Sequence, residues 1–106
     1  MNTKTLAPLH PGEVLLEEFM RPMGISQNQL ARDLKVPPRR INEIVNRKRG
    51  ITSDTALRLA RHFGTSAQFW MGLQADYDLE LAEDAYADKI YGEVKVRDSS
   101  QKTTAA

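Results

Sequence analysis

The stretch SQNQLARDLKVPPRRINEIVNRKRG, residues 26–50, contains two short helix-forming segments joined by very little chain. Ser26 is a good N-cap for the first segment, and Gln29 stands three residues later, at the capping-box spacing. Pro38 suits the first turn of the second segment, because an amide at that position would have no partner anyway. About three residues, 35–37, separate the two helices, which is typical of a helix-turn-helix with steeply crossing axes.

The apolar residues of both segments repeat with the period of an α-helix and mark the faces that meet. They are Leu30, Ala31 and Leu34 in the first segment and Ile41, Ile44 and Val45 in the second. Ala31 is small where the helices would approach closely, and Ile41 is apolar where the second helix packs back. We therefore expect a helix from about Pro38 to Asn46 whose opposite face points away from the core.

That opposite face is polar and carries the chemistry of base recognition. It holds Arg39, Glu43 and Asn46, flanked by Arg40, Asn42 and Arg47. Arginine can bind guanine bidentately, asparagine can bind adenine, and glutamate can accept a hydrogen bond from cytosine. The run Arg47, Lys48 and Arg49 follows at the helix end, where cations also suit the helix dipole. We expect this run to lie over phosphates and to set the register on the duplex.

Three further helices are predicted, which makes the fold all-α with five helices. One opens at His10-Pro11 and ends near Pro22 and Gly24; one follows Thr52 or Ser53 and ends at Gly64; the last starts at Thr65 or Ser66. The last helix repeats Phe69, Leu73, Tyr77 and Leu81 at four-residue steps. This helix also carries a stripe of large side chains, Phe69, Trp70, Leu73 and Tyr77. The stripe has more apolar surface than the core of four short helices needs, so we expect part of it in the core and part at a dimer interface. A hint of a strand at 94–96 is too short to carry weight.

With 106 residues the chain has room for one compact domain. We expect a flexible N-terminus over 1–8, a helix-turn-helix domain over 9–82, a C-terminal extension over 83–96 and a disordered tail over 97–106. The tail has no apolar side chain larger than alanine, so it has little to bury.

Several classes of function find no support in the composition. There is no cysteine, and His10 and His62 have no acidic partners at metal-ligand spacing, so we expect no metal site. Asp33, Glu43 and Asp54 could serve in acid–base catalysis, but no nucleophile, phosphate loop or metal motif accompanies them. We expect neither an enzyme nor a cofactor.

The same composition bears on where the protein acts. No apolar run approaches the roughly 18 residues that a membrane span requires, and the N-terminus lacks the apolar core of a signal peptide. We expect a cytoplasmic protein that does not bind membranes.

The net charge of +1 conceals a strong division along the chain. Residues 32–61 contain nine Lys or Arg and three acidic residues, a balance of +6, whereas residues 76–88 contain six acidic residues and no basic one, a balance of −6. A basic run is usually only a solvated helix face. Beside the tight turn of residues 35–37, the basic middle favours binding to a polyanion, and the acidic segment must then face away from it.

The run LHPGEVLLEEFMRPMGISQNQLARDLKV, followed by RRINEIVNRKRGITSDTALRLARHFGTSAQFWMGLQADYDLELA, resembles the HigA-type antitoxins of the xenobiotic-response-element helix-turn-helix family. The resemblance covers about residues 9–82, and its most specific pieces are HPGE at 10–13, RGIT at 49–52 and FWMGLQADYDL at 69–79. It implies a lambda-repressor-like fold and a homodimer that binds double-stranded operator DNA and represses its own operon. It also implies that the protein neutralises a cognate RelE-like toxin, an mRNA-cleaving ribonuclease.

Site residues follow from the resemblance position by position. It implies DNA contacts from Gln27, Arg39, Arg40, Asn42, Glu43 and Asn46, and phosphate contacts from Arg47, Lys48 and Arg49. Two departures from the family pattern concern the turn. Lys35 stands where glycine is common, so we expect a positive φ there at a cost of about 1 kcal/mol. Pro37 stands where a Ser or Thr cap is common.

Two other functions remain open from the sequence. The protein could be a stand-alone transcriptional regulator without a toxin, or a protein-interaction module whose basic face binds an acidic partner. The acidic residues of 76–88 could cover the basic surface of a toxin, could compete for that role with Glu13, Glu17 and Glu18, or could serve solubility alone.

Overall fold

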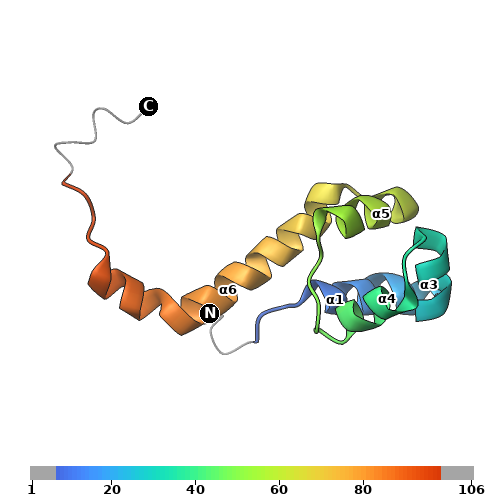
Figure 1. Cartoon of the computed structure of the whole chain (residues 1–106), viewed down its shortest axis with the longest axis horizontal. Coiled ribbons are helices and arrows are strands. Elements are labelled where there is room, and N and C mark those ends of the chain that lie inside the picture. Colours follow the sequence, from blue (N-terminus) through green and yellow to red (C-terminus); the bar gives the residue numbers. More distant parts are fainter. Residues whose placement is uncertain (1–6, 99–106) are drawn as a thin grey trace.

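The computed structural model describes residues 7–98, which are helical apart from short connections and the last few residues and contain no strand (Figure 1). The elements are α1 (Pro11–Val14), η2 (Leu15–Met20), α2 (Arg21–Met23), α3 (Gln27–Leu34), α4 (Pro38–Val45), α5 (Ser53–Phe63) and α6 (Ala67–Glu93). The all-α prediction is confirmed, because α1, η2 and α2 together occupy the place of the first expected helix. Within this part of the chain, residues 94–96 form no strand. Most of the segments expected to be flexible or disordered, 1–8 and 97–106, lie outside the described residues.

The first helical segment widens into a π-helix before it ends. Residues Leu15–Met20 are π-helical, and the N–H of Arg21 bonds to the carbonyl of Leu16, five residues back. Pro22 follows at once and has no N–H with which to continue an α-helical ladder. The chain then turns at Gly24, whose φ of 65° is left-handed.

Three of the later helices begin at N-cap residues that the sequence predicts. Ser26, Thr52 and Ser66 each accept a hydrogen bond from the backbone N–H three residues on, with distances of 3.1, 3.4 and 3.0 Å. Pro37 precedes α4 without a side-chain cap, as its chemistry requires. The first segment is capped by an imidazole: Nδ1 of His10 accepts from the N–H of Gly12 at 2.8 Å.

The turn between α3 and α4 is built on Lys35, and its expected positive φ is confirmed at 60°. The N–H of Lys35 bonds to Arg32 O at 3.2 Å, and the N–H of Val36 bonds to Ala31 O at 3.0 Å. These two bonds form a Schellman motif, which satisfies the last carbonyls of α3. Buried Val36 then anchors the chain before α4 begins. The turn therefore closes as in a helix-turn-helix although lysine stands at the left-handed position.

The core gathers around Trp70, which has no exposed surface. Its ring lies 5.0 Å from that of Phe19, and its indole N–H donates to Thr65 Oγ1 at 2.8 Å. Trp70 therefore belongs to the part of the stripe expected in the core and has no surface to offer a second protomer. Other fully buried side chains from η2, α3, α4 and α5 include Leu15, Met20, Leu30, Ile41, Ile44 and Leu59.

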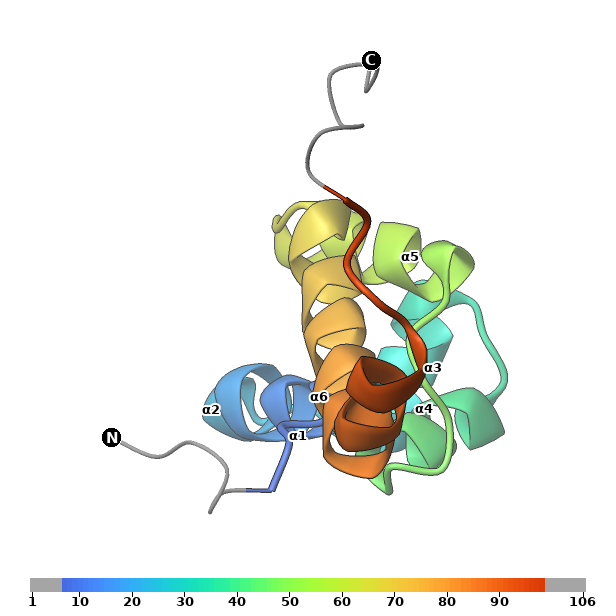
Figure 2. The same ribbon diagram turned by 90° about the vertical axis from the view of Figure 1, so that its left-hand side faces the viewer.

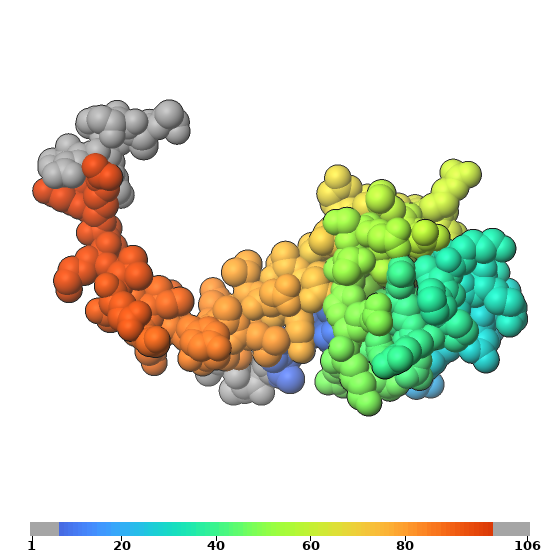
Figure 3. Space-filling model, in the orientation of Figure 1, coloured from blue at the N-terminus to red at the C-terminus, as the bar shows by residue number. Residues whose placement is uncertain are grey.

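The last helix is much longer than the four-residue repeat indicated. It runs without a break to Glu93, so residues 83–93 of the expected C-terminal extension continue the helix. Its first half packs on α5 and α1, and its second half leaves the rest of the fold, as Figures 1 and 2 show from two directions. We call residues 79–93 the arm. The arm makes the molecule elongated, with extents of 57 × 34 × 25 Å, and its projection is plain in the space-filling view of Figure 3.

Candidate nucleic-acid interface

Helices α3 and α4 pack against each other and present one polar face of α4 to solvent. Ile41 and Ile44 have no exposed surface and Val45 is buried, which leaves Arg39, Asn42 and Asn46 on the exposed side. The helical period thus sorts core from surface on α4 as expected. The polar residues of this face are not independent of one another, because most of them are joined by hydrogen bonds or ion pairs.

Glu43 lies at the centre of the face and accepts from two arginines. Oε2 accepts from Arg39 Nε at 2.8 Å, and Oε1 accepts from Arg49 Nε at 2.8 Å and forms an ion pair with Arg49 Nη2 at 2.7 Å. The hydrogen bonds from Arg39 and then from Arg49 lower the pKa of the Glu43 carboxyl. The side chain of Arg39 is 83% exposed and that of Glu43 only 21%. Arg39 therefore projects outward from a carboxylate that lies closer to the helix.

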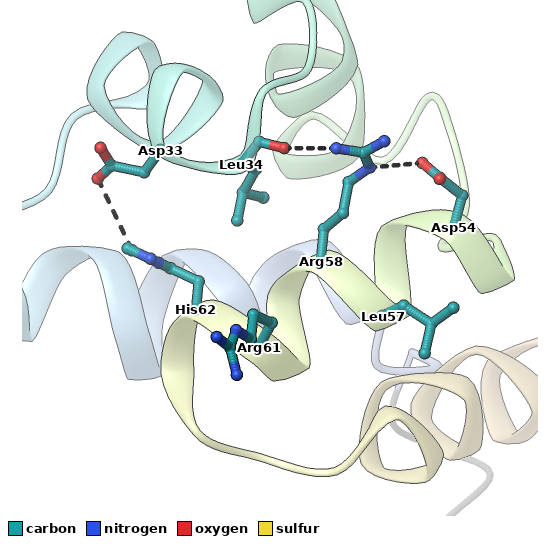
Figure 4. Close-up of a pocket in the computed structure, with 7 residues that line it drawn as sticks. All are labelled: Asp33, Leu34, Asp54, Leu57, Arg58, Arg61 and His62. Carbon is teal, nitrogen blue, oxygen red and sulfur yellow. Dashed lines mark hydrogen bonds and ion pairs between the residues drawn. The ribbon is translucent and has the colours of Figure 1, made fainter.

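Arg40 points in another direction and does not join this group. Its Nη1 bonds to Asp54 Oδ2 at 2.7 Å, and the same oxygen accepts from Arg58 Nε at 3.0 Å. Arg58 also donates to the carbonyl of Leu34 at 2.8 Å, so it joins α5 to the end of α3 (Figure 4). Hydrogen bonds from Arg58 and then Arg40 lower the pKa of Asp54. Sequence reasoning missed the part of Asp54 and Arg58, although their i,i+4 spacing on α5 was a signal for the pair.

Gln27 lies beside α4, as expected of a residue at the start of α3. Its Oε1 accepts from Asn42 Nδ2 at 3.1 Å, so two predicted contact residues from different helices meet as an amide pair. Both amides keep further donors and acceptors for another ligand.

Arg47, Lys48 and Arg49 do not extend α4 but turn away after its end. Arg47 has a φ of 61°, a left-handed conformation that the sequence did not reveal, since no glycine marks it. Arg47 N–H bonds to Ile44 O at 3.0 Å and Lys48 N–H to Glu43 O at 2.8 Å, a second Schellman motif. The guanidinium of Arg47 lies 3.6 Å from the carboxylate of Glu13 in α1. All three basic side chains remain exposed beside the α4 face.

The HPGE and RGIT motifs fix the position of α4 through contacts with other helices. A Cβ on Gly12 would overlap the carbonyl oxygen of Ile44, so only glycine lets α1 approach α4 this closely. In the second motif, Gly50 leaves room for the side chain of Gln74, whose Oε1 accepts from the N–H of Ile51 at 2.6 Å. The two motifs therefore join α1 to the C-terminal end of α4 and α6 to the segment that follows it.

An open depression of about 520 Å³ lies next to the α3–α4 turn (Figure 4). Its lining is Asp33, Leu34, Asp54, Leu57, Arg58, Arg61 and His62. His62 Nε2 lies 3.7 Å from Asp33 Oδ2, the contact expected of a surface histidine. Acidic and basic side chains both line the depression and pair with each other there. The depression therefore lacks the positive potential with which a surface attracts a polyanion.

Residues 7–98 hold no group of three or more His, Asp or Glu that could bind a metal ion. None of the helices in this part of the chain combines the length and the apolar character that crossing a membrane requires.

Comparison with known proteins agrees with this geometry. The helix-turn-helix family matches residues 16–70. Virulence-associated protein I of Dichelobacter nodosus is 59% identical over 75 residues, covering 71% of this chain and 69% of the relative. Antitoxin HigA-1 of Vibrio cholerae serotype O1 is 30% identical over 82 residues, covering 77% of each. A solved structure of Pseudomonas aeruginosa antitoxin HigA with the higBA promoter has a TM-score of 0.81 and 49% identity, covering 83% of this chain and 96% of that one.

The fold and the α4 face thus define a DNA-binding helix-turn-helix domain of the xenobiotic-response-element type. The chain belongs to this helix-turn-helix family, in its HigA-type antitoxin branch. The family consists of DNA-binding antitoxins and regulators and not of enzymes.

Proposed function

We propose that this protein represses its own operon by binding operator DNA, and that it neutralises a RelE-like toxin encoded beside it. The observation that carries the DNA part is the exposed face of α4, with Arg39 projecting outward and a basic turn beside it. The similarity to a HigA antitoxin solved with its promoter supports the same assignment. Both activities would take place in the cytoplasm, where the operator and the toxin are found.

The roles of the site residues follow from their positions. Arg39 and Asn46 would read bases from the major groove, and the amide pair of Gln27 and Asn42 would read bases beside them. Arg47 and Lys48 would neutralise phosphates and set the register, whereas Arg49 is paired with Glu43 and would contribute less to these contacts. Arg40 is paired with Asp54 and only partly exposed, so we assign it to positioning α4 against α5 rather than to base reading.

We propose that the protein works as a two-fold dimer, because one recognition helix buries too little surface for operator-level affinity. A dimer presents two such helices about 34 Å apart to successive major grooves. Of the residues first expected at the interface, Leu73 and Tyr77 are largely covered within the chain, where the ring of Tyr77 lies 4.8 Å from that of His10. Phe69 remains 40% exposed.

The arm offers a better surface for a second protomer. Leu79, Tyr86 and Ile90 are large and exposed, and their seven- and four-residue steps place them on one face of α6. Leu79 follows buried Trp70 by nine residues, about half a turn around the helix, so this face points away from the core. Exposed apolar residues aligned in this way are typical of a protein interface. We propose that the arms of two protomers pair through them.

The toxin-binding surface would then lie on the acidic side of α6. The six acidic residues Asp76, Asp78, Glu80, Glu83, Asp84 and Asp88 are all exposed. The competing patch on the first helical segment is already partly neutralised, since Glu17 pairs with Arg21 at 3.1 Å and Glu13 lies 3.6 Å from Arg47. An acidic arm suits a ribonuclease, whose substrate-binding surface must be basic.

Expression together with the neighbouring gene tests the proposal. If that gene encodes a small basic ribonuclease, we expect the two products to purify together and the ribonuclease to be inactive in the complex. A mobility shift on the gene's own promoter tests DNA binding separately. Promoter binding without a co-purifying toxin would mean a stand-alone regulator, and a toxin complex without promoter binding would contradict autorepression. If the protein binds neither the promoter nor a toxin, the remaining alternative is a protein-interaction module whose basic face binds an acidic partner.

A further inference from the structure

Glu43 is a carboxylate on the surface that we assign to DNA, where a negative charge repels phosphates. Its two oxygens are both engaged, Oε2 with Arg39 and Oε1 with Arg49. A glutamate that reads cytosine would need a free oxygen directed outward, whereas this one is the least exposed member of the group at 21%. The function of Glu43 therefore has to be sought in what it does to the two arginines.

The chain brings Arg49 to Glu43 through a strained turn. Arg39 reaches Glu43 from one helical turn earlier on α4, which any i,i+4 pair could do. Arg49 lies outside the helix and returns only because Arg47 adopts a left-handed φ of 61°. The N–H of Lys48 then bonds to the carbonyl of Glu43 itself at 2.8 Å. A non-glycine residue in this conformation costs energy, and such strain tends to be kept where function needs the geometry.

The two arginines are held in different ways, and this decides what each can still do. Arg39 donates to Glu43 through Nε and its side chain is 83% exposed, so its terminal nitrogens Nη1 and Nη2 are accessible to another ligand. Two parallel N–H groups of this kind match the O6 and N7 acceptors of guanine. Arg49 donates from Nε to one carboxylate oxygen and holds Nη2 2.7 Å from the same oxygen, so two of its three guanidinium nitrogens face Glu43. Glu43 thus leaves Arg39 available to a ligand and restrains Arg49. We call Glu43, Arg39 and Arg49 together the clamp.

We propose that Glu43 is a specificity-determining residue that positions Arg39 for one guanine and withholds Arg39 and Arg49 from the phosphates of non-specific DNA. Free guanidinium groups would bind any phosphate within reach, which raises affinity for every sequence alike. The inference rests on the proposed binding of operator DNA. A purely structural i,i+4 ion pair would not change the preference between two DNA sequences.

The test compares the affinity of the full-length protein for two duplexes, its own promoter fragment and a scrambled fragment of equal length and composition. Glu43→Asp keeps the charge but shortens the side chain by one methylene, so it cannot reach both arginines. We expect the ratio of promoter to scrambled affinity to fall about tenfold, as expected for loss of one bidentate base contact. Glu43→Gln keeps the length and loses the charge. It should raise affinity for scrambled DNA and steepen the salt dependence by up to about one phosphate contact for each arginine released.

A double-mutant cycle separates positioning from direct reading. In an Arg39→Ala background, Glu43→Asp should change the affinity ratio much less than in the wild type, because the arginine that Glu43 positions is gone and only the release of Arg49 remains. Glu17→Asp is the matched control, since Glu17 also holds an i,i+4 arginine, Arg21, but lies on η2. It should leave the ratio as in the wild type. Circular dichroism and thermal unfolding check that each variant is folded.

Two results would overturn the clamp while leaving promoter binding in place. One is a ratio that Glu43→Asp does not change in the wild-type background. The other is a fall of equal size with and without Arg39, which would mean that Glu43 reads a base directly. Failure of the proposed function looks different, because the wild-type protein would then show no preference for its promoter, and the clamp would fail with it.

Discussion

At the scale of single residues, His10 caps the first helical segment from a buried position. Its side chain is 2% exposed, its Nδ1 accepts the N–H of Gly12, and its ring packs edge-on against Tyr77 of α6. Burial, and then the charge of Arg47, lower the pKa of His10 below 6.5, against opposing effects of Glu13 and Asp78. The neutral imidazole is therefore the folded form, and protonation of Nδ1 would remove the cap.

Stability should consequently depend on pH near neutrality. Because the folded pKa lies below the unfolded value, the contribution of His10 is fully present above about pH 6.5 and is lost as pH falls through that value toward the folded pKa. We expect the unfolding free energy, measured with urea, to decline from pH 7 to pH 5. His10→Asn keeps a capping oxygen but cannot titrate there, so it should flatten this decline. His62→Asn is the control, and a decline that only His62→Asn removes would contradict the assignment.

Gly12 is important because it has no side chain. A Cβ at this position would meet the backbone carbonyl of Ile44, which cannot move without α4. Gly12→Ala should therefore lower the unfolding free energy by about 1–3 kcal/mol, the usual cost of overpacking, and weaken promoter binding through the displaced α4. Gly92→Ala, where a Cβ meets nothing within 4 Å, should be neutral or slightly stabilising. Equal tolerance of both substitutions in thermal unfolding would show that α1 and α4 can separate freely.

At the scale of elements, α4 and the turn after it should make separable contributions to DNA binding. Arg39→Ala should cost about 1–3 kcal/mol on the promoter and relax the sequence preference, because it removes a bidentate base contact. Lys48→Ala should weaken promoter and scrambled DNA alike and reduce the salt slope by about one, because it removes a phosphate contact. Titrations over a range of salt concentrations measure both quantities. The division of roles is wrong if both variants lose affinity equally on the two duplexes.

At the scale of the whole molecule, the arm should control the oligomeric state. Leu79→Lys or Ile90→Lys places a charge on the exposed apolar face and should shift sedimentation toward a monomer at micromolar concentration. Promoter affinity should fall with it, since both half-sites can no longer be bound by one particle. Leu81→Lys is the control, because Leu81 is also exposed but lies two residues from Leu79 and thus on the other side of α6. Dimers that survive both substitutions on the apolar face would place the interface elsewhere.

The acidic side of α6 should govern association with the toxin. Reversing the charge at Asp76, Glu80 and Glu83 should slow toxin binding markedly at low salt, and the difference should shrink as salt rises. Promoter affinity should hold or improve in the same variant, since repulsion from phosphates is reduced. Stopped-flow association at several salt concentrations measures the effect. An unchanged rate at low salt would leave these residues with no role beyond solubility.

Much of this protein follows from interactions between residues close together in the chain. The caps at Ser26, Thr52 and Ser66, the periodic apolar faces and the left-handed turn at Lys35 depend on neighbours within about five positions. Sequence alone therefore sufficed for the helix-turn-helix and for the outward face of α4. The end of α6 could not be predicted, because the apolar repeat stops near Leu81, whereas the residues beyond it are compatible with a helix and no proline interrupts it.

Only the tertiary structure decided which side chains from different elements meet. The pairs of Arg40 with Asp54 and of Gln27 with Asn42 span 14 and 15 residues, and no sequence period relates them. The burial of Trp70 and the need for glycine at position 12 likewise arise where distant helices meet. The physical reason is that hydrogen bonds and ion pairs depend on distances of a few ångströms, which the helical repeat sets within one helix. Between helices those distances are set by the packing of the whole core.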